Sequence, residues 1–241
     1  GVGGRRLRGG DRRRGAAVSA RLDHMMVLAD TLAQGVAWCE ATLGVVPAPG
    51  GQHPLFGTHN RLLALGGAAF AQAYLEIIAI DPAAGDPGRT RWFDMDDQRL
   101  RRQVRAQGPQ LIHWVARVPE LARAAAAWAA LGLERGAVLP ASRMTPRGLL
   151  EWQITVREDG QRLLDGCLPT LIQWGAVHPA DALPASGIAL ESLSLRHPQA
   201  ALLRAALDAV GLAGVAVEPG PAALQARLAT PRGAVTLAGF S

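Results

Sequence analysis

Short apolar runs alternate with amphipathic segments along this chain. Residues 22–28 form an apolar run, and residues 32–43 then carry apolar side chains at the spacing of one helical face. The same order returns at residues 111–118 and 121–131. A short run rich in large apolar residues is typical of a strand. The pattern therefore predicts a strand followed by a helix, made twice.

Further strand-like runs follow each expected helix. They lie at residues 45–46, 60–65 and 73–80 in the first copy, and at residues 138–139, 149–156 and 168–174 in the second. A third, fainter copy begins with a strand-like run at residues 190–195. We predict an α+β fold in which tandem β-α-β-β-β modules form a cupped mixed sheet, with a third, smaller and degenerate module at the C-terminus. The expected segments are a disordered basic leader at 1–20 and modules at 21–97, 98–180 and 187–241.

Four polar side chains occupy equivalent positions in the first two copies. His24 and His113 lie near the start of the first strand, and Glu76 and Gln173 lie in the last strand. Two copies that pair pseudo-symmetrically would bring these four side chains toward one centre. Two imidazoles, a carboxylate and an amide oxygen suit a divalent metal such as Zn²⁺, Ni²⁺, Co²⁺, Mn²⁺ or Fe²⁺. The alternative is that each histidine is a hydrogen-bonded core residue.

Three motifs give the repeat a family resemblance. They are "LDH" at residues 22–24, "GTHNRLL" at residues 57–63 and "YLEIIAIDP" at residues 74–82. Over about residues 21–180 the chain resembles the glyoxalase-like domain branch of the vicinal oxygen chelate superfamily, which includes glyoxalases, bleomycin resistance proteins and dioxygenases. The resemblance implies metal ligands on the first and last strands of each module. In this sequence those positions are His24, Glu76, His113 and Gln173.

Gln173 departs from the family pattern, because many metal enzymes of the superfamily carry a carboxylate at that position. A glutamine side chain is not a useful proton acceptor, which argues against glyoxalase I chemistry itself. Glu76 is then the one carboxylate of the set that can act as a general base. We therefore predict Glu76 as the catalytic residue.

Four further residues are candidates for substrate binding. His59, Asn60 and Arg61 could contact an anionic or carbonyl group, with Arg61 as a bidentate clamp. Trp92, in the linker between the first two modules, could cover the pocket. The alternatives are that residues 57–60 form only a hairpin turn and that Trp92 only pins the linker to the core.

Composition excludes several classes of partner. The net charge of +5 comes from residues 1–20, which hold six arginines and one acid, so the rest of the chain has no bulk basic signature for nucleic acid. No glycine-rich phosphate loop is present, so we expect no nucleotide cofactor. No apolar run approaches the ~20 residues of a membrane helix. Two cysteines make no disulfide framework, and without an export signal we expect a cytoplasmic protein.

Two functions remain open from the sequence. The first is a metal-dependent lyase, isomerase or dioxygenase-type enzyme that acts on a small oxygen-rich molecule chelated by the metal. The second is a metal-free protein that binds or sequesters a small molecule on the same fold. A homodimer is compatible with either, although tandem modules can complete a cup within one chain. We expect the aromatic walls of the binding site to come from five tryptophans: Trp38, Trp92, Trp114, Trp152 and Trp174.

Overall fold

The computed structural model describes residues 19–239, so the predicted basic leader lies outside the described residues apart from Ser19 and Ala20. The first module contains β1 (Arg21–Leu28), α1 (Leu32–Leu43), β2 (Ala48–His53), β3 (Thr58–Ala64) and β4 (Tyr74–Ile80). After α2 (Gln98–Gln107), the second contains β5 (Gln110–Arg117), α3 (Leu121–Ala129), β6 (Ala137–Thr145), β7 (Gly148–Val156) and β8 (Thr170–Trp174). The third contains β9 (Ala189–His197), α4 (Ala200–Ala209), β10 (Val215–Pro219), β11 (Ala223–Thr230) and β12 (Gly233–Ala238). Short 3-10 turns lie at Ala68–Phe70, Leu164–Gly166 and Pro179–Ala182.

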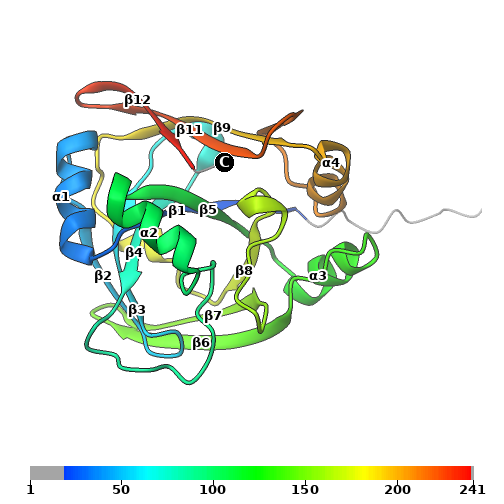
Figure 1. Ribbon diagram of the computed structural model, residues 1–241, viewed down its shortest axis with the longest axis horizontal. Coiled ribbons are helices and arrows are strands. Elements are labelled where there is room, and N and C mark those ends of the chain that lie inside the picture. Colours follow the sequence, from blue (N-terminus) through cyan, green and yellow to red (C-terminus); the bar gives the residue numbers. More distant parts are fainter. Residues whose placement is uncertain (1–18, 240–241) are drawn as a thin grey trace, which may run out of the picture.

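The first two modules share one eight-stranded sheet, in the order β2-β3-β4-β1-β5-β8-β7-β6. At its centre β1 and β5 pair antiparallel, and each pairs in parallel with the last strand of its own module. The sheet is strongly curved, so its two edge strands, β2 and β6, approach each other (Figure 1). The predicted cupped mixed sheet is thereby confirmed.

The third module covers the outside of this cup. Its strands form a separate sheet in the order β10-β9-β11-β12, seen as the upper layer in Figure 1. One apolar cluster joins this sheet to α1, α3, α4 and the convex face of the main sheet. Trp128 of α3 donates a hydrogen bond to the carbonyl of Ala206 in α4 at 2.7 Å. Both cysteines, Cys39 and Cys167, are buried in this layer as free thiols.

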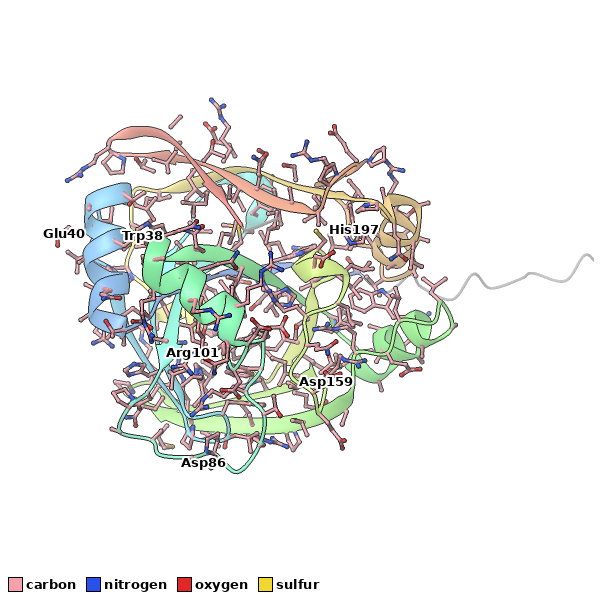
Figure 2. All side chains as sticks on the ribbon, in the orientation of Figure 1. Trp38, Glu40, Asp86, Arg101, Asp159 and His197 are labelled. Carbon is pink, nitrogen blue, oxygen red and sulfur yellow. The ribbon has the colours of Figure 1, made fainter. Side chains whose placement is uncertain are left out.

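The linker between β4 and α2 packs into the concave side of the cup. Its residues Trp92, Phe93 and Met95 are buried there, followed by Leu100 and Val104 of α2. The exposed turn of the same linker carries Asp86, at the lower edge of Figure 2. No helix within residues 19–239 is long and apolar enough to cross a membrane. Because the linker fills much of the cup, only a small space remains at its centre.

The position predicted for the second strand, residues 45–46, was wrong. Val46 is 59% exposed, and the strand begins instead at Ala48. The sequence of β2, APGGQH, has low strand propensity. Its pairing with β3 is supported by the Gly51 N–H, which donates to Asn60 Oδ1 at 2.8 Å, and by Gly50, where an added Cβ would overlap Asn60. Tertiary contacts of this kind are invisible to local propensity.

Gly35 allows α1 to pack closely on the sheet, because an added Cβ would overlap Ile77 Cγ2 of β4. Alanine would gain about 1 kcal/mol of helix propensity, but overpacking costs about 1–3 kcal/mol. We therefore expect Gly35→Ala to lower the free energy of unfolding by up to about 2 kcal/mol, measured by urea denaturation. Glu40→Ala, on the exposed side of the same helix (Figure 2), should change it by less than about 0.5 kcal/mol. A stabilised Gly35→Ala variant would contradict this description of the packing.

Candidate functional site

The parallel pairing of β1 with β4 places two ionisable side chains together on the concave face. His24 lies opposite Tyr74 and Met26 opposite Glu76, so His24 and Glu76 are diagonal neighbours on one face of the sheet. His24 Nε2 lies 3.3 Å from Glu76 Oε2, and the two side chains are only 6% and 7% exposed. An acid and a base therefore face each other where almost no water reaches them.

Asp23 fixes the orientation of His24. The register between β1 and β5 shifts between Leu22 and His24, and such a bulge redirects a side chain. The fully buried Asp23 carboxylate accepts hydrogen bonds from His24 Nδ1 at 2.7 Å, from Trp174 Nε1 at 3.0 Å and from His178 Nε2 at 2.8 Å. Because His24 Nδ1 is committed to Asp23, its Nε2 is the nitrogen presented to Glu76.

The second oxygen of Glu76 is held by Asn60. Asn60 Nδ2 donates to Glu76 Oε1 at 2.7 Å, while the backbone of Gly51 fixes the other end of the amide. His53 Nε2 lies 4.0 Å from the same oxygen, and His53 Nδ1 is 3.0 Å from Thr58 Oγ1. The carboxylate is thus oriented by neighbours on both sides.

The pair is charged in this setting. Burial by itself would lower the pKa of His24, but its hydrogen bond with Asp23 and its contact with Glu76 outweigh burial and raise the pKa to about 9. Burial alone would raise the pKa of Glu76, but the interactions with His24, His53 and Asn60 lower it to about 2. His53 differs, because burial lowers its pKa to about 4 despite the charge of Glu76. The site therefore holds an imidazolium, a carboxylate and a neutral imidazole near pH 7.

Aromatic side chains enclose the pair. Tyr74 stacks on His24 with ring centroids 4.6 Å apart, and its pKa is raised well above its ordinary value by burial. Trp92, Trp152 and Trp174 line the remaining walls of a cavity of about 40 Å³. Since a single water needs roughly 10–15 Å³ on a comparable scale, the cavity takes only a group of a few atoms.

The linker wall is held in an uncommon backbone conformation. Phe93 and Asp94 have φ values of 59° and 58°, a region that residues other than glycine rarely adopt. Arg162 Nε donates to Asp94 Oδ2 at 2.8 Å, and the Asp94 N–H donates to the carbonyl of Gly160 at 2.9 Å. These contacts with the second module keep Trp92 and Phe93 inside the cup.

The small cavity adjoins a larger groove of about 760 Å³. This outer groove lies along the two edge strands, β2 and β6, and the segment 177–184. Four residues line both spaces: Leu62, Arg143, Leu150 and Pro179. The cup therefore has a small inner cavity that opens toward a larger outer groove.

Comparison with known families matches residues 22–211 to the family described as "Glyoxalase-like domain". The chain belongs to the glyoxalase-like domain family. This confirms the resemblance to the vicinal oxygen chelate superfamily found in the sequence. No curated protein matches the chain.

Three solved structures show similarity to this glyoxalase-like protein at low sequence identity. A hypothetical protein from Staphylococcus aureus is 14% identical with a TM-score of 0.54, over 84% of this chain and 87% of that chain. Methylmalonyl-CoA epimerase from Mycobacterium tuberculosis is 16% identical with a TM-score of 0.37, over 67% of this chain and 92% of that chain. The Streptomyces coelicolor epimerase in complex with 2-nitronate-propionyl-CoA is 18% identical with a TM-score of 0.40, over 67% and 99%.

The structure brings together only two of the four expected metal ligands, His24 and Glu76. His113 is fully buried, with Nδ1 3.0 Å from the carbonyl of Gly166 and Nε2 2.9 Å from Thr170 Oγ1. Burial lowers its pKa well below the ordinary value, and both ring nitrogens have hydrogen-bond partners. Gln173 Oε1 instead accepts from the backbone N–H of Leu121 at the start of α3, at 2.8 Å.

The expected donor set therefore does not fit a divalent metal. Catalytic zinc sites use three protein ligands at about 2 Å from the ion, and here two of the four candidates are occupied elsewhere. Within residues 19–239, no three or more His, Cys, Asp and Glu side chains are arranged to hold one metal ion.

The residues expected to bind substrate divide between the two faces of β3. Asn60 and Leu62 face the cavity, whereas His59 and Arg61 alternate to the other side, as a strand requires. His59 Nδ1 lies 3.9 Å from Asp81 Oδ1, and Arg61 Nη1 is 3.4 Å from the carbonyl of Asn60. The hairpin turn precedes them at residues 54–57. Asn60 and Trp92 therefore lie at the site, and His59 and Arg61 do not.

Two of the expected wall tryptophans also lie elsewhere. Trp114 is fully buried in the convex-side core, where its Nε1 donates to the carbonyl of Cys167 at 2.8 Å. Trp38 lies on α1 and packs against the same core. Only Trp92, Trp152 and Trp174 of the five line the cavity.

Sequence reasoning missed several residues of the site. Asp23 follows the leucine of the "LDH" motif but carries no signal of its own, and His53 stands in a segment rich in Gly and Pro that has no apolar periodicity. His178 lies in a Pro/Ala-rich linker, where its Nδ1 accepts from the Ala180 N–H at 3.2 Å and leaves Nε2–H to donate to Asp23. Arg143 lies on an edge strand without apolar periodicity. Only His53 and His178 share a signal, since each directly precedes a proline, and that pattern is too frequent to select a site.

The ion pair makes stability depend on pH in both directions. Stabilisation through His24, whose pKa is raised, is complete below about pH 6.5 and is lost as the pH rises through about 9. Stabilisation through Glu76, whose pKa is lowered, is complete above about pH 4.5 and is lost as the pH falls through about 2. We expect Glu76→Gln to weaken the decline in Tm between pH 6.5 and 9, measured by differential scanning fluorimetry. Parallel profiles for wild type and variant over that range would contradict the pairing.

Proposed function

We propose that this glyoxalase-like protein is an enzyme that moves a proton next to a carbonyl group of a small oxygen-rich molecule. The observation that carries the proposal is the contact of His24 Nε2 with Glu76 Oε2 at 3.3 Å in a cavity nearly closed to water. An acid and a base at this separation can act on adjacent atoms of one substrate. The reaction classes that begin with this step are isomerisation, epimerisation and elimination by a lyase.

Glu76 is the proposed base and His24 the proposed electrophile. Glu76 takes the proton from the carbon, and the imidazolium Nε2–H of His24 donates to the oxygen on which negative charge develops. A substrate oxygen that accepts from His24 takes that hydrogen bond away from Glu76. Because the bond is one cause of the low pKa of Glu76, its basicity rises when substrate binds. Delivery of that proton from Glu76 to the adjacent carbon completes an isomerisation, whereas an epimerisation needs a proton added to the opposite face of the same carbon.

The metal-dependent form of this function has less support. It would need His113 and Gln173 to join His24 and Glu76, and the hydrogen bonds of both residues hold them elsewhere. A dioxygenase-type reaction on a chelated substrate needs the same ligand set. Elemental mass spectrometry of the purified chain, beside His24→Ala, tests this form directly. Stoichiometric metal that is lost in the variant would favour it over the metal-free step.

A small-molecule binding protein is the second candidate. The three tryptophans around the cavity favour it, because flat aromatic walls bind organic molecules without chemistry. Such a protein would bind a ligand and leave it unchanged. Its affinity would depend on the tryptophans and not on Glu76.

The test is exchange of carbon-bound protons with solvent. The purified chain is incubated in D₂O with a panel of 2-oxo acids and 2-oxoaldehydes, and loss of the proton next to the carbonyl is followed by NMR. We expect at least one compound to exchange faster than without protein, and Glu76→Gln to abolish the acceleration. Binding of a compound without any exchange would favour the sequestering protein instead.

A further inference from the structure

Arg143 of β6 reaches across the gap between the two edges of the cup. An added Cβ at Gly51 of β2 would overlap its guanidinium, so the side chain lies directly over that glycine. Arg143 lines both the inner cavity and the outer groove. Its charge also contributes to the low pKa of His53. The guanidinium therefore stands at the passage between the two spaces.

No carboxylate within residues 19–239 forms an ion pair with Arg143. The arginines that pair with acids within residues 19–239 are Arg91, Arg105, Arg117, Arg157, Arg162 and Arg227. Asp181 also lines the groove, but its carboxylate oxygens accept from Gln72 Nε2 at 2.8 Å and from the His178 N–H at 3.3 Å. A guanidinium with free donors at a narrow passage is suited to a carboxylate.

The outer groove is mainly apolar. Its lining includes Pro49, Pro54, Met144, Leu150, Val177 and Leu183. Met144 is 74% exposed and Val177 is 37% exposed, so apolar surface is left open beside the passage. A volume of about 760 Å³ is within the usual range for a small-molecule site. The inner cavity, at about 40 Å³, is far too small for the same molecule.

We propose that the ligand of this cup is an amphipathic organic acid, with its apolar body in the outer groove and its carboxylate on Arg143. The carboxylate end of the molecule then faces the inner cavity, which has room for only a few atoms. This inference rests on the proposed function for any chemistry at that end, but not for the binding of the acid. Arg143 is a specificity-determining residue in this account, and Glu76 and His24 carry the reaction.

The experiment compares two probes of equal chain length, octanoate and octan-1-ol, by isothermal titration calorimetry on the full chain. We expect octanoate to bind at least about tenfold more tightly, since a hydrogen bond between two charged groups is stronger than one to a neutral hydroxyl group. Arg143→Gln should reduce the affinity for octanoate to that for octan-1-ol and leave the affinity for the alcohol within about twofold. Arg147→Gln, the same charge change in the same groove, should keep the preference for octanoate.

A second variant tests the position of the guanidinium without removing its charge. Gly51→Ala should displace Arg143 from the passage and weaken octanoate binding, with circular dichroism and thermal melting confirming that each variant is folded. Equal affinities of wild type for the two probes, a preference that survives Arg143→Gln, or a preference lost in Arg147→Gln would each overturn the proposal. The two proposals can fail separately. If wild type shows no exchange activity but octanoate still binds to wild type and to Glu76→Gln, the proposed reaction is wrong and the anion site is supported.

Discussion

Replacing Glu76 by glutamine is expected to lower the rate of proton exchange by about 10²–10⁴-fold, the contribution of a positioned general base. Glutamine is nearly isosteric and can still accept a hydrogen bond from Asn60, which now donates to Glu76 at 2.7 Å. It cannot accept a proton, and it removes the negative charge beside His24. The rate should therefore fall through kcat more than through KM, as measured by NMR exchange in D₂O at several substrate concentrations.

Glu151→Gln is the matched control for this substitution. Glu151 lies on β7, is exposed, and does not line the inner cavity. The same loss of charge at that position should leave the exchange rate within about twofold of wild type. A Glu76→Gln variant that is as active as Glu151→Gln would remove Glu76 from the mechanism.

Replacing Asp23 by alanine is expected to lower the free energy of unfolding by about 3–5 kcal/mol, which is the usual cost of removing one partner of a buried ion pair. The carboxylate is fully buried and accepts hydrogen bonds from His24, His178 and Trp174. Removing it leaves two buried donors, on His24 and His178, and one half-buried donor, on Trp174, without an acceptor, and takes the counter-charge away from His24. The loss of unfolding free energy is measured by urea denaturation at pH 6, where the ion pair of His24 with its carboxylates is fully formed.

Asp159→Ala is the comparison for Asp23→Ala. Asp159 pairs with Arg157 at 2.7 Å and its side chain is 40% exposed at the surface (Figure 2). A surface ion pair contributes about 0–1 kcal/mol, so this variant should be close to wild type. If Asp23→Ala is no less stable than Asp159→Ala, the network around Asp23 does not stabilise the fold.

The modules were predictable because their signals are periodic. Hydrophobic periodicity distinguishes strand from helix when a segment is long enough. This holds for the apolar runs that form β1 and β5 and for the amphipathic segments that form α1 and α3. β2 was misplaced because its Pro- and Gly-containing sequence is stabilised by β3 and not by its own residues. The internal repeat also identified His24 and Glu76 as partners, which the parallel pairing of β1 with β4 brings together.

The internal repeat gave wrong expectations for side chains whose surroundings differ between the two modules. His113 occupies the position equivalent to His24, but Gly166 and Thr170 take both of its ring nitrogens. Gln173 belongs to the strand equivalent to that of Glu76, but its side chain caps α3. Pseudo-symmetry of the backbone does not make the side chains symmetric. Asp23 could not be predicted either, because its role depends on a bulge that arises only when β1 pairs with β5.

The most direct test of the central claim is the protonation state of His24, observed by long-range ¹H–¹⁵N correlation NMR on the chain labelled at its six histidines. Loss of a signal in His24→Gln assigns the residue. The account predicts that His24 is an imidazolium at pH 7, that it loses its proton near pH 9, and that Glu76→Gln lowers this pKa. A neutral His24 at pH 7, with a titration unchanged by Glu76→Gln, would contradict an ion pair of these two residues at the centre of the cup.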